Sequence, residues 1–128
     1  MSNCCSGKRN VLLYACSGGA NVAEISDKAV RELMFEGTAT MFCLAGVGAG
    51  IDGMVQTAKD ADLNLVIDGC PMECAKKIFD RHGIEYAYLK VTDLGIEKVK
   101  GVRCTQEQVD EVAAKAREML AGPGKCCG

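Results

Sequence analysis

Short apolar runs alternate with longer amphipathic runs along this chain, and that alternation is the strongest constraint on its fold. The short runs have the length and composition of buried strands and predict strands at residues 10–15, 38–44, 63–68 and 85–91. A β-α-β-α-β-α-β-α order with right-handed crossovers makes a parallel sheet with helices on both faces. We therefore predict a single three-layer α/β domain, Rossmann-like or flavodoxin-like, with about four parallel strands. The pattern does not fix the strand order; we favour 2-1-3-4, with the first strand central.

Capping signals mark the first and last predicted helices. Asn21, with Glu24 three residues later, has the form of a capping box, and Gly37 supplies a stop. Between these residues, apolar side chains recur at helical spacing: Val22, Ile25, Ala29 and Leu33. Thr105 and Gln108 have the same capping form at the start of a last helix. One face of that helix is apolar and carries Val109, Val112, Ala116 and Met119.

Two further helices are predicted in the middle of the chain. One follows a glycine-rich stretch and continues to about residue 61. The other has Pro71 in its first turn, where proline is well tolerated, and ends near His82 and Gly83. His82, the single histidine of the chain, is then a surface residue favoured by the helix dipole rather than a ligand. Residues 92–103 follow no pattern that we can interpret.

Length and charge limit the classes of function. A chain of 128 residues forms one domain that buries roughly two-thirds of its unfolded surface, so it needs no metal merely to fold. We place this domain at residues 9–122, between cysteine-containing tails at 1–8 and 123–128. A net charge of −2, without any Lys/Arg cluster longer than two residues, gives nucleic-acid binding no support. We find no membrane-spanning run and no signal-peptide character at the start, and so expect a cytoplasmic protein.

The chain contains nine cysteines, which in a reducing cytoplasm indicate metal or redox chemistry rather than disulfides. Four of them lie at or just beyond the ends of predicted strands: Cys16, Cys43, Cys70 and Cys74. In a parallel sheet these ends share one edge, which is also where open α/β sheets bind ligands. Four thiolates at about 2.3 Å form a tetrahedral Zn(II) site. We therefore predict that these four cysteines bind Zn(II); the alternative is four buried core cysteines.

Three segments carry the motifs of a known family: residues 15–21 (ACSGGAN), 43–50 (CLAGVGAG) and 68–75 (DGCPMECA). In this order and spacing they resemble the DGC-domain family, which is named for the Asp-Gly-Cys motif found here at residues 68–70 and is described as zinc-binding. The resemblance covers roughly residues 9–100. It implies that Cys16, Cys43, Cys70 and Cys74 correspond to the family's four zinc-associated cysteines. It implies no reaction, and the cysteines of the two tails lie outside it.

Residues 48–53 form a literal GxGxxG motif, and Asp68 follows at the end of the next strand. We do not expect nucleotide binding, because the first glycine lies five residues beyond Cys43 and four strands supply little more than half of a dinucleotide fold. Instead, the small residues would let backbone N–H groups approach and hydrogen-bond the thiolates. Ser17 and Asp68 are candidate hydrogen-bonding partners that orient the metal ligands, although Asp68 could equally just end a strand.

Four of the remaining cysteines form two terminal pairs, and one stands alone. The pairs are Cys4 with Cys5 and Cys126 with Cys127. The first strand starts, and the last helix ends, at the opposite edge of the sheet, so both tails are expected to leave roughly 20 Å from the main site, at about 3.3 Å per strand residue. The pairs form either a second soft-metal or redox-active thiol site or no specific site. We interpret Cys104 as a half-buried thiol rather than a fifth ligand.

Together these features predict a metal-binding protein that carries, senses or buffers Zn(II), or acts in redox-linked metabolism. Two alternatives stay open. One is an enzyme whose zinc is held by three thiolates and has an open coordination position; the other is an iron–sulfur or thiol electron carrier. The expected partners are the metal ion and a metal-donor or redox protein. The sequence indicates no catalytic residue and no oligomeric state.

Overall fold

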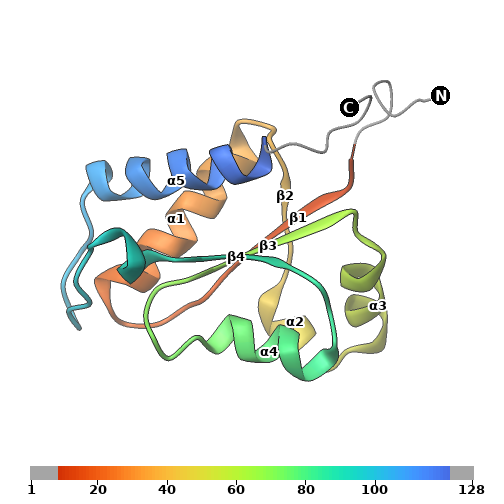
Figure 1. Cartoon of the computed structure of the whole chain (residues 1–128). Helices are drawn as coiled ribbons and strands as arrows, with labels where there is room; N and C mark the ends of the chain where they lie inside the picture. Colours follow the sequence, from red (N-terminus) through yellow and green to blue (C-terminus); the bar gives the residue numbers. More distant parts are fainter. Residues whose placement is uncertain (1–8, 122–128) are drawn as a thin grey trace.

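The sheet has four strands, all parallel, in the order β2-β1-β3-β4 (Figure 1). The structure is a computed structural model that describes residues 9–121. Its strands are β1 (Val11–Ala15), β2 (Thr40–Met41), β3 (Leu63–Asp68) and β4 (Ala87–Lys90). The predicted parallel sheet and the favoured strand order are confirmed. The central strands β1 and β3 pair in register from Val11–Leu63 to Ala15–Ile67, so the residues that follow both strands start side by side.

Helices cover both faces of this sheet, which confirms the three-layer prediction (Figure 1). One face carries α1 (Asn21–Phe35) and α5 (Gln106–Leu120). The other face carries α2 (Leu44–Gly48), α3 (Asp52–Asp60) and α4 (Cys74–His82). A short 3-10 helix, η1 (Val91–Leu94), follows β4. Among the residues described, none of the helices has the length and apolar character needed to cross a membrane.

Strand β1 shows how the sheet builds two hydrophobic cores. Its side chains alternate between faces, as a strand requires. Leu13 packs in the core under α1 and α5, whereas Leu12 and Tyr14 pack in the core under α2, α3 and α4. Tyr14 is fully buried; its hydroxyl donates to Asn64 Oδ1 at 2.9 Å and its ring meets Phe79 edge-on, with centroids 4.6 Å apart. Cores on both faces hold the carboxyl edge of the sheet in place.

The start of α1 differs from the prediction, because Asn21 is not its N-cap. Ala20 occupies the cap position and supplies no side-chain bond. Asn21 is buried and instead holds the segment that follows η1: its Nδ2 donates to Glu97 O at 2.9 Å and its Oδ1 accepts from Val99 N at 2.7 Å. The side chain of Asn21 therefore forms hydrogen bonds with residues distant in sequence and none with the N–H groups of the first turn of α1. The consequence is that the uninterpreted residues 92–103 are tied to the start of α1.

Glu24 is likewise not a capping-box residue. Its carboxylate accepts from Cys104 N at 3.0 Å and pairs with Arg103 at 2.9 Å, fixing the entry to α5. The capping box predicted for α5 is confirmed, with Thr105 and Gln108 bonded reciprocally. The same capping pattern thus occurs at two helix starts but forms a capping box only at α5. At α1, Asn21 and Glu24 instead hydrogen-bond to residues 97–104.

The hydrogen bonds of Glu24 predict an acid-dependent loss of stability. The bond from Cys104 N, followed by that from Arg103, lowers the pKa of Glu24 to about 2. Because this folded-state pKa lies below the usual value, the stabilisation is present above about pH 4.5 and is lost as the pH falls toward 2. Replacement Glu24→Gln should therefore lower Tm at pH 7, and the difference from wild type should shrink between pH 4.5 and 2. Thermal melts across this range test it, with Glu111→Gln on the exposed face of α5 as the control; a Tm difference independent of pH would contradict it.

The middle of the chain departs from the prediction in four places. The second strand has only two residues instead of the predicted 38–44, and the fourth is shortened to β4. The single helix predicted to about residue 61 is two helices, α2 and α3, separated at Gly50, whose φ of +74° breaks helical geometry. Pro71 is not in a helix: α4 begins three residues later, because Glu73 has a left-handed backbone (φ 55°).

Candidate metal centre

Cys16 directly follows β1 and is held by two neighbours. Its Sγ accepts a hydrogen bond from Gly69 N, on the adjacent strand end, at 3.2 Å. It also lies 3.3 Å from the hydroxyl of Ser26, which projects from α1. Burial raises the pKa of the Cys16 thiol, and the hydrogen bonds with Ser26 and Gly69 act in the opposite direction. Cys16 is therefore a half-buried thiol whose thiolate form already has hydrogen-bond partners.

Gly69 can approach Cys16 because it has no side chain. A Cβ at this position would lie 2.8 Å from the backbone carbon of Val22 and 3.0 Å from Ala23 N. The first turn of α1 therefore packs directly on the Asp-Gly-Cys segment. This close approach brings the loop after β1 and the loop after β3 to one place.

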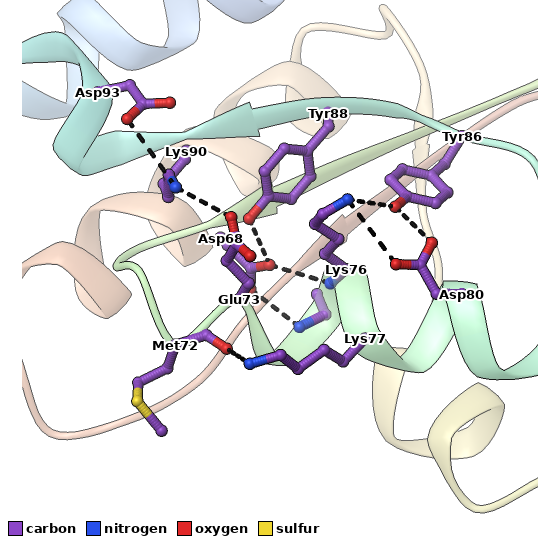
Figure 2. A network of polar contacts seen from close by, with 11 residues as sticks. Asp68, Met72, Glu73, Lys76, Lys77, Asp80, Tyr86, Tyr88, Lys90 and Asp93 are labelled. Carbon is purple, nitrogen blue, oxygen red and sulfur yellow. Dashed lines mark hydrogen bonds and ion pairs between the residues drawn. The ribbon is translucent and has the colours of Figure 1, made fainter.

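A tight turn separates Cys70 from Cys74. Glu73 N donates to Cys70 O at 3.1 Å, and Pro71 occupies the second position of this turn, which suits its fixed φ. Among residues 9–121, Glu73 is the one residue other than glycine with a positive φ. This conformation costs free energy and persists only where surrounding contacts compensate for the cost. Its carboxylate pairs with Lys90 at 2.9 Å (Figure 2), and this ion pair lowers the pKa of Glu73. Cys74 then becomes the first residue of α4.

Asp68, the first residue of the Asp-Gly-Cys motif, fixes the start of α4 (Figure 2). This carboxylate is buried and accepts from Ala75 N and Lys76 N, both at 3.0 Å, and from the Tyr88 hydroxyl at 2.9 Å. Burial, together with the bond to Asp68, raises the pKa of Tyr88, so that hydroxyl remains a donor. Asp68 thus both ends β3 and positions the helix that carries Cys74.

Three of the predicted ligands line one cavity of about 160 Å³ at the carboxyl edge of the sheet: Cys16, Cys70 and Cys74. Ser17 lines it as well, as do Lys98 and Lys100 from the segment held by Asn21. The Lys98 ammonium lies 3.4 Å from Cys70 Sγ. The cavity, which we call the thiol cavity, therefore combines sulfur atoms with positive charge.

Cys43 has a different environment. It does not line the thiol cavity but caps α2, its Sγ accepting from Gly46 N at 3.3 Å. The donor Gly46 precedes the GxGxxG residues 48–53, and none of the hydrogen bonds to cysteine sulfur within residues 9–121 comes from that motif. Within residues 9–121, no three side chains of Cys, His, Asp or Glu stand close enough together to hold a metal ion as they are placed. The structure thus places three thiols around one cavity, but they do not form a ligand cluster as they are placed.

The other sequence-predicted residues are also placed. His82 is the last residue of α4, and Cys104 is half-buried beside the core under α1 and α5. Gly48 ends α2, so the GxGxxG motif is not a loop between a strand and a helix. Arg9 donates to Leu120 O at 2.9 Å, which places the two ends of the described chain together. The tail cysteines lie outside the described residues: Cys4, Cys5, Cys126 and Cys127.

Three residues of this site were missed by the sequence analysis. Ser26 lies on the buried face of α1, among residues at apolar spacing, and that position was a signal that could have identified it. Lys98 and Lys100 belong to the segment without periodicity, and their place at the cavity depends on the buried anchor Asn21. No local pattern in the sequence indicates that anchor.

Comparisons with known proteins identify the family of this chain. The model of the DGC domain family matches residues 12–116. Among curated proteins, the "Anaerobic and virulence modulator AnvM" of Pseudomonas aeruginosa is 31% identical over 115 residues, which span 89% of this chain and 88% of that protein. No solved structure matches the chain. Since both matches include the segments that carry the cavity cysteines, we conclude that the chain belongs to the DGC domain family.

Proposed function

We propose that this chain binds Zn(II) through the thiolates of Cys16, Cys70 and Cys74, with Cys43 as a fourth ligand, and serves in metal handling, sensing or redox-linked metabolism. The observation that carries the proposal is the thiol cavity, where three cysteines from two adjacent strand ends and a helix start face one space. Membership of the DGC family supports a cysteine-rich metal-binding protein in general terms. Cys43 would have to move from its capping position to complete the set.

The residues present suit such an ion. Thiolate sulfur is the ligand that Zn(II) and other soft metals prefer over Mg²⁺ or Ca²⁺. When bound, Zn(II) would supply a Lewis-acidic centre shared by the thiolates. The chain contributes the arrangement: Gly69 N and the Ser26 hydroxyl orient Cys16, and Asp68 holds the helix start that carries Cys74. Lys98 offsets negative charge at Cys70.

A zinc enzyme with an open coordination position is the second candidate. The observation in its favour is that Cys43 lies outside the thiol cavity, which leaves three thiols at the cavity itself. Three protein ligands and one exchangeable position are typical of catalytic zinc. Under this alternative, Cys43→Ser would leave zinc binding unchanged.

Metal content of the anaerobically purified full chain, together with competition against a chelator, tests the proposal. Serine variants of Cys16, Cys70 and Cys74 should each weaken zinc binding by more than the roughly 10- to 100-fold typical of losing a supporting hydrogen bond, since a ligand itself is removed. Cys43→Ser should have a smaller effect. Cys104→Ser is the matched control, a half-buried cysteine outside the cavity, and should bind zinc as wild type does.

The tail cysteines are separated by a further variant. In this variant, serine replaces the four tail cysteines, Cys4, Cys5, Cys126 and Cys127. The zinc of the main site should remain bound. The proposal fails if the wild-type chain binds no zinc, or if Cys16→Ser binds it with unchanged affinity. A brown protein with visible absorbance and bound iron would instead identify an iron–sulfur cluster.

A further inference from the structure

A short segment contributes residues to the lining of the thiol cavity and is held there by backbone hydrogen bonds. Residues 97–101 run beside the start of α1, where Ala20 and Lys100 form an antiparallel bridge. Asn21 N donates to Val99 O at 3.0 Å, and Gly101 N donates to Gly19 O at 2.9 Å. The side chain of Asn21 adds its two bonds to the same segment. The segment is therefore fixed relative to the cysteines.

This segment presents two lysines to the cavity. Lys98 and Lys100 are two residues apart, and both line the cavity. Within residues 9–121, neither lysine forms an ion pair with a carboxylate. The cavity thus carries two ammonium groups that have no carboxylate partner in the described part of the chain; Lys98 contacts Cys70 Sγ at 3.4 Å.

The acidic residues of the cavity are already engaged. Asp68 accepts three hydrogen bonds from α4 and Tyr88. Glu73 is paired with Lys90. Neither carboxylate neutralises Lys98 or Lys100, so the cavity favours an anion.

The size of the cavity restricts the anion. A volume of about 160 Å³ equals roughly five water molecules at about 30 Å³ each. It is well below the roughly 300–1,000 Å³ of sites for drug-sized ligands. A nucleotide or a peptide is too large, whereas a molecule of a few heavy atoms fits. The same cavity is lined by the three thiols, of which Cys70 lies closest to a lysine, with its Sγ 3.4 Å from Lys98 Nζ.

We propose that the thiol cavity binds a small anionic thiol, whose carboxylate pairs with Lys98 and Lys100 and whose sulfur faces Cys16, Cys70 and Cys74. The sulfur end of this proposal rests on the proposed zinc site. The carboxylate end depends on the lysines alone and does not require a metal.

Three probes separate the two ends of the ligand: 3-mercaptopropionate has both groups, propionate has the carboxylate alone and 2-mercaptoethanol has the thiol alone. Each is titrated into the full chain, zinc-loaded and metal-free, with the amide NMR signals of Gly18, Gly19 and Gly69 as the readout. In zinc-loaded protein, 3-mercaptopropionate should bind more tightly than either fragment. In metal-free protein, it and propionate should bind with similar, weaker affinity and shift the same signals.

Charge-removing variants test the role of the lysines. Lys98→Gln and Lys100→Gln should each weaken 3-mercaptopropionate by about fivefold, the upper range for a solvent-accessible ion pair, and leave 2-mercaptoethanol unaffected. Lys59→Gln, an exposed lysine of α3 at the opposite edge of the sheet, is the matched control and should change nothing. Zinc content is measured in every variant and should equal that of wild type in Lys100→Gln and Lys59→Gln. Because Lys98 also contacts Cys70 Sγ, the effect of Lys98→Gln on the anion is measured with propionate in the metal-free chain.

The outcomes distinguish this inference from the proposed function. If zinc binds but 3-mercaptopropionate is no tighter than 2-mercaptoethanol, or is unaffected by either lysine variant, the small-anion proposal is overturned and the metal site stands. If zinc does not bind, lysine-dependent binding of propionate to the metal-free chain supports the anion end while the metal proposal fails. Propionate that shifts none of the three glycine signals contradicts the anion end directly.

Discussion

Replacing Gly69 by alanine is expected to destabilise the fold by about 3 kcal/mol, the upper part of the range for overpacking a well-packed site. The new Cβ would lie 2.8 Å from the backbone carbon and 2.9 Å from the carbonyl oxygen of Val22. Backbone atoms of a helix cannot rotate away as a side chain can, so α1 and β3 must separate. Gly69 has no positive φ, so the cost comes from space and not from backbone conformation. Denaturant unfolding measures the change.

Gly53→Ala is the control for this prediction. A Cβ at Gly53, in the first turn of α3, would meet no described atom within 4 Å. Alanine there should leave stability unchanged or raise it by up to about 1 kcal/mol, because alanine is the better helix former. Gly69→Ala should also disturb Cys16, whose sulfur accepts from Gly69 N. A Gly69→Ala chain as stable as wild type would show that the two loops are not packed as described.

Replacing Asp68 by alanine is expected to cost about 3 kcal/mol, since hydrogen bonds to a charged group contribute about 1.5–3 kcal/mol each and are not additive. The change removes the acceptor for Ala75 N, Lys76 N and the Tyr88 hydroxyl. Release of the buried charge offsets part of the loss, which keeps the expected value well below the sum of three bonds. Urea unfolding at neutral pH gives the measurement.

Tyr88→Phe separates the helix contacts of Asp68 from its contact with β4. It removes one of the three donors and keeps the ring, so it should cost about 1–2 kcal/mol. The double variant should then show coupling, because the two residues share a bond. Asp68→Ala should weaken zinc binding as well, since the helix start that carries Cys74 loses its anchor. A loss below about 1 kcal/mol for Asp68→Ala would contradict the role given to this carboxylate.

The elements that could be predicted from the sequence are those decided by local periodicity. The residues of β3 are all apolar except at two positions, and its predicted limits, 63–68, match the structure. The capping box at Thr105 is satisfied within four residues and was likewise predicted correctly. In both cases the information needed lies within one element.

Other features depend on contacts between distant segments and could not be predicted. Asn21 resembles a helix cap, but its partners Glu97 and Val99 lie almost 80 residues away. The start of α4 follows Glu73, which has a left-handed backbone and whose carboxylate pairs with Lys90 of the distant strand β4. The same holds for the candidate site. Strand ends placed Cys16, Cys70 and Cys74 at one edge, whereas the lysines reach them through a segment without any sequence signal.

The contacts of Cys16 determine when during synthesis the cavity can form. Its sulfur accepts a hydrogen bond from a residue 53 positions later, and the hydrogen bond that holds residues 97–101 to Asn21 spans 78 positions. At about 5–20 residues per second, a ribosome needs on the order of 10 s to extend the chain from Cys16 past residue 100. Until Gly69 and residues 97–101 have been synthesised, the Cys16 thiol lacks the contacts that it has in the folded chain. Metal can therefore enter a finished thiol cavity only after most of the polypeptide has been made and folded.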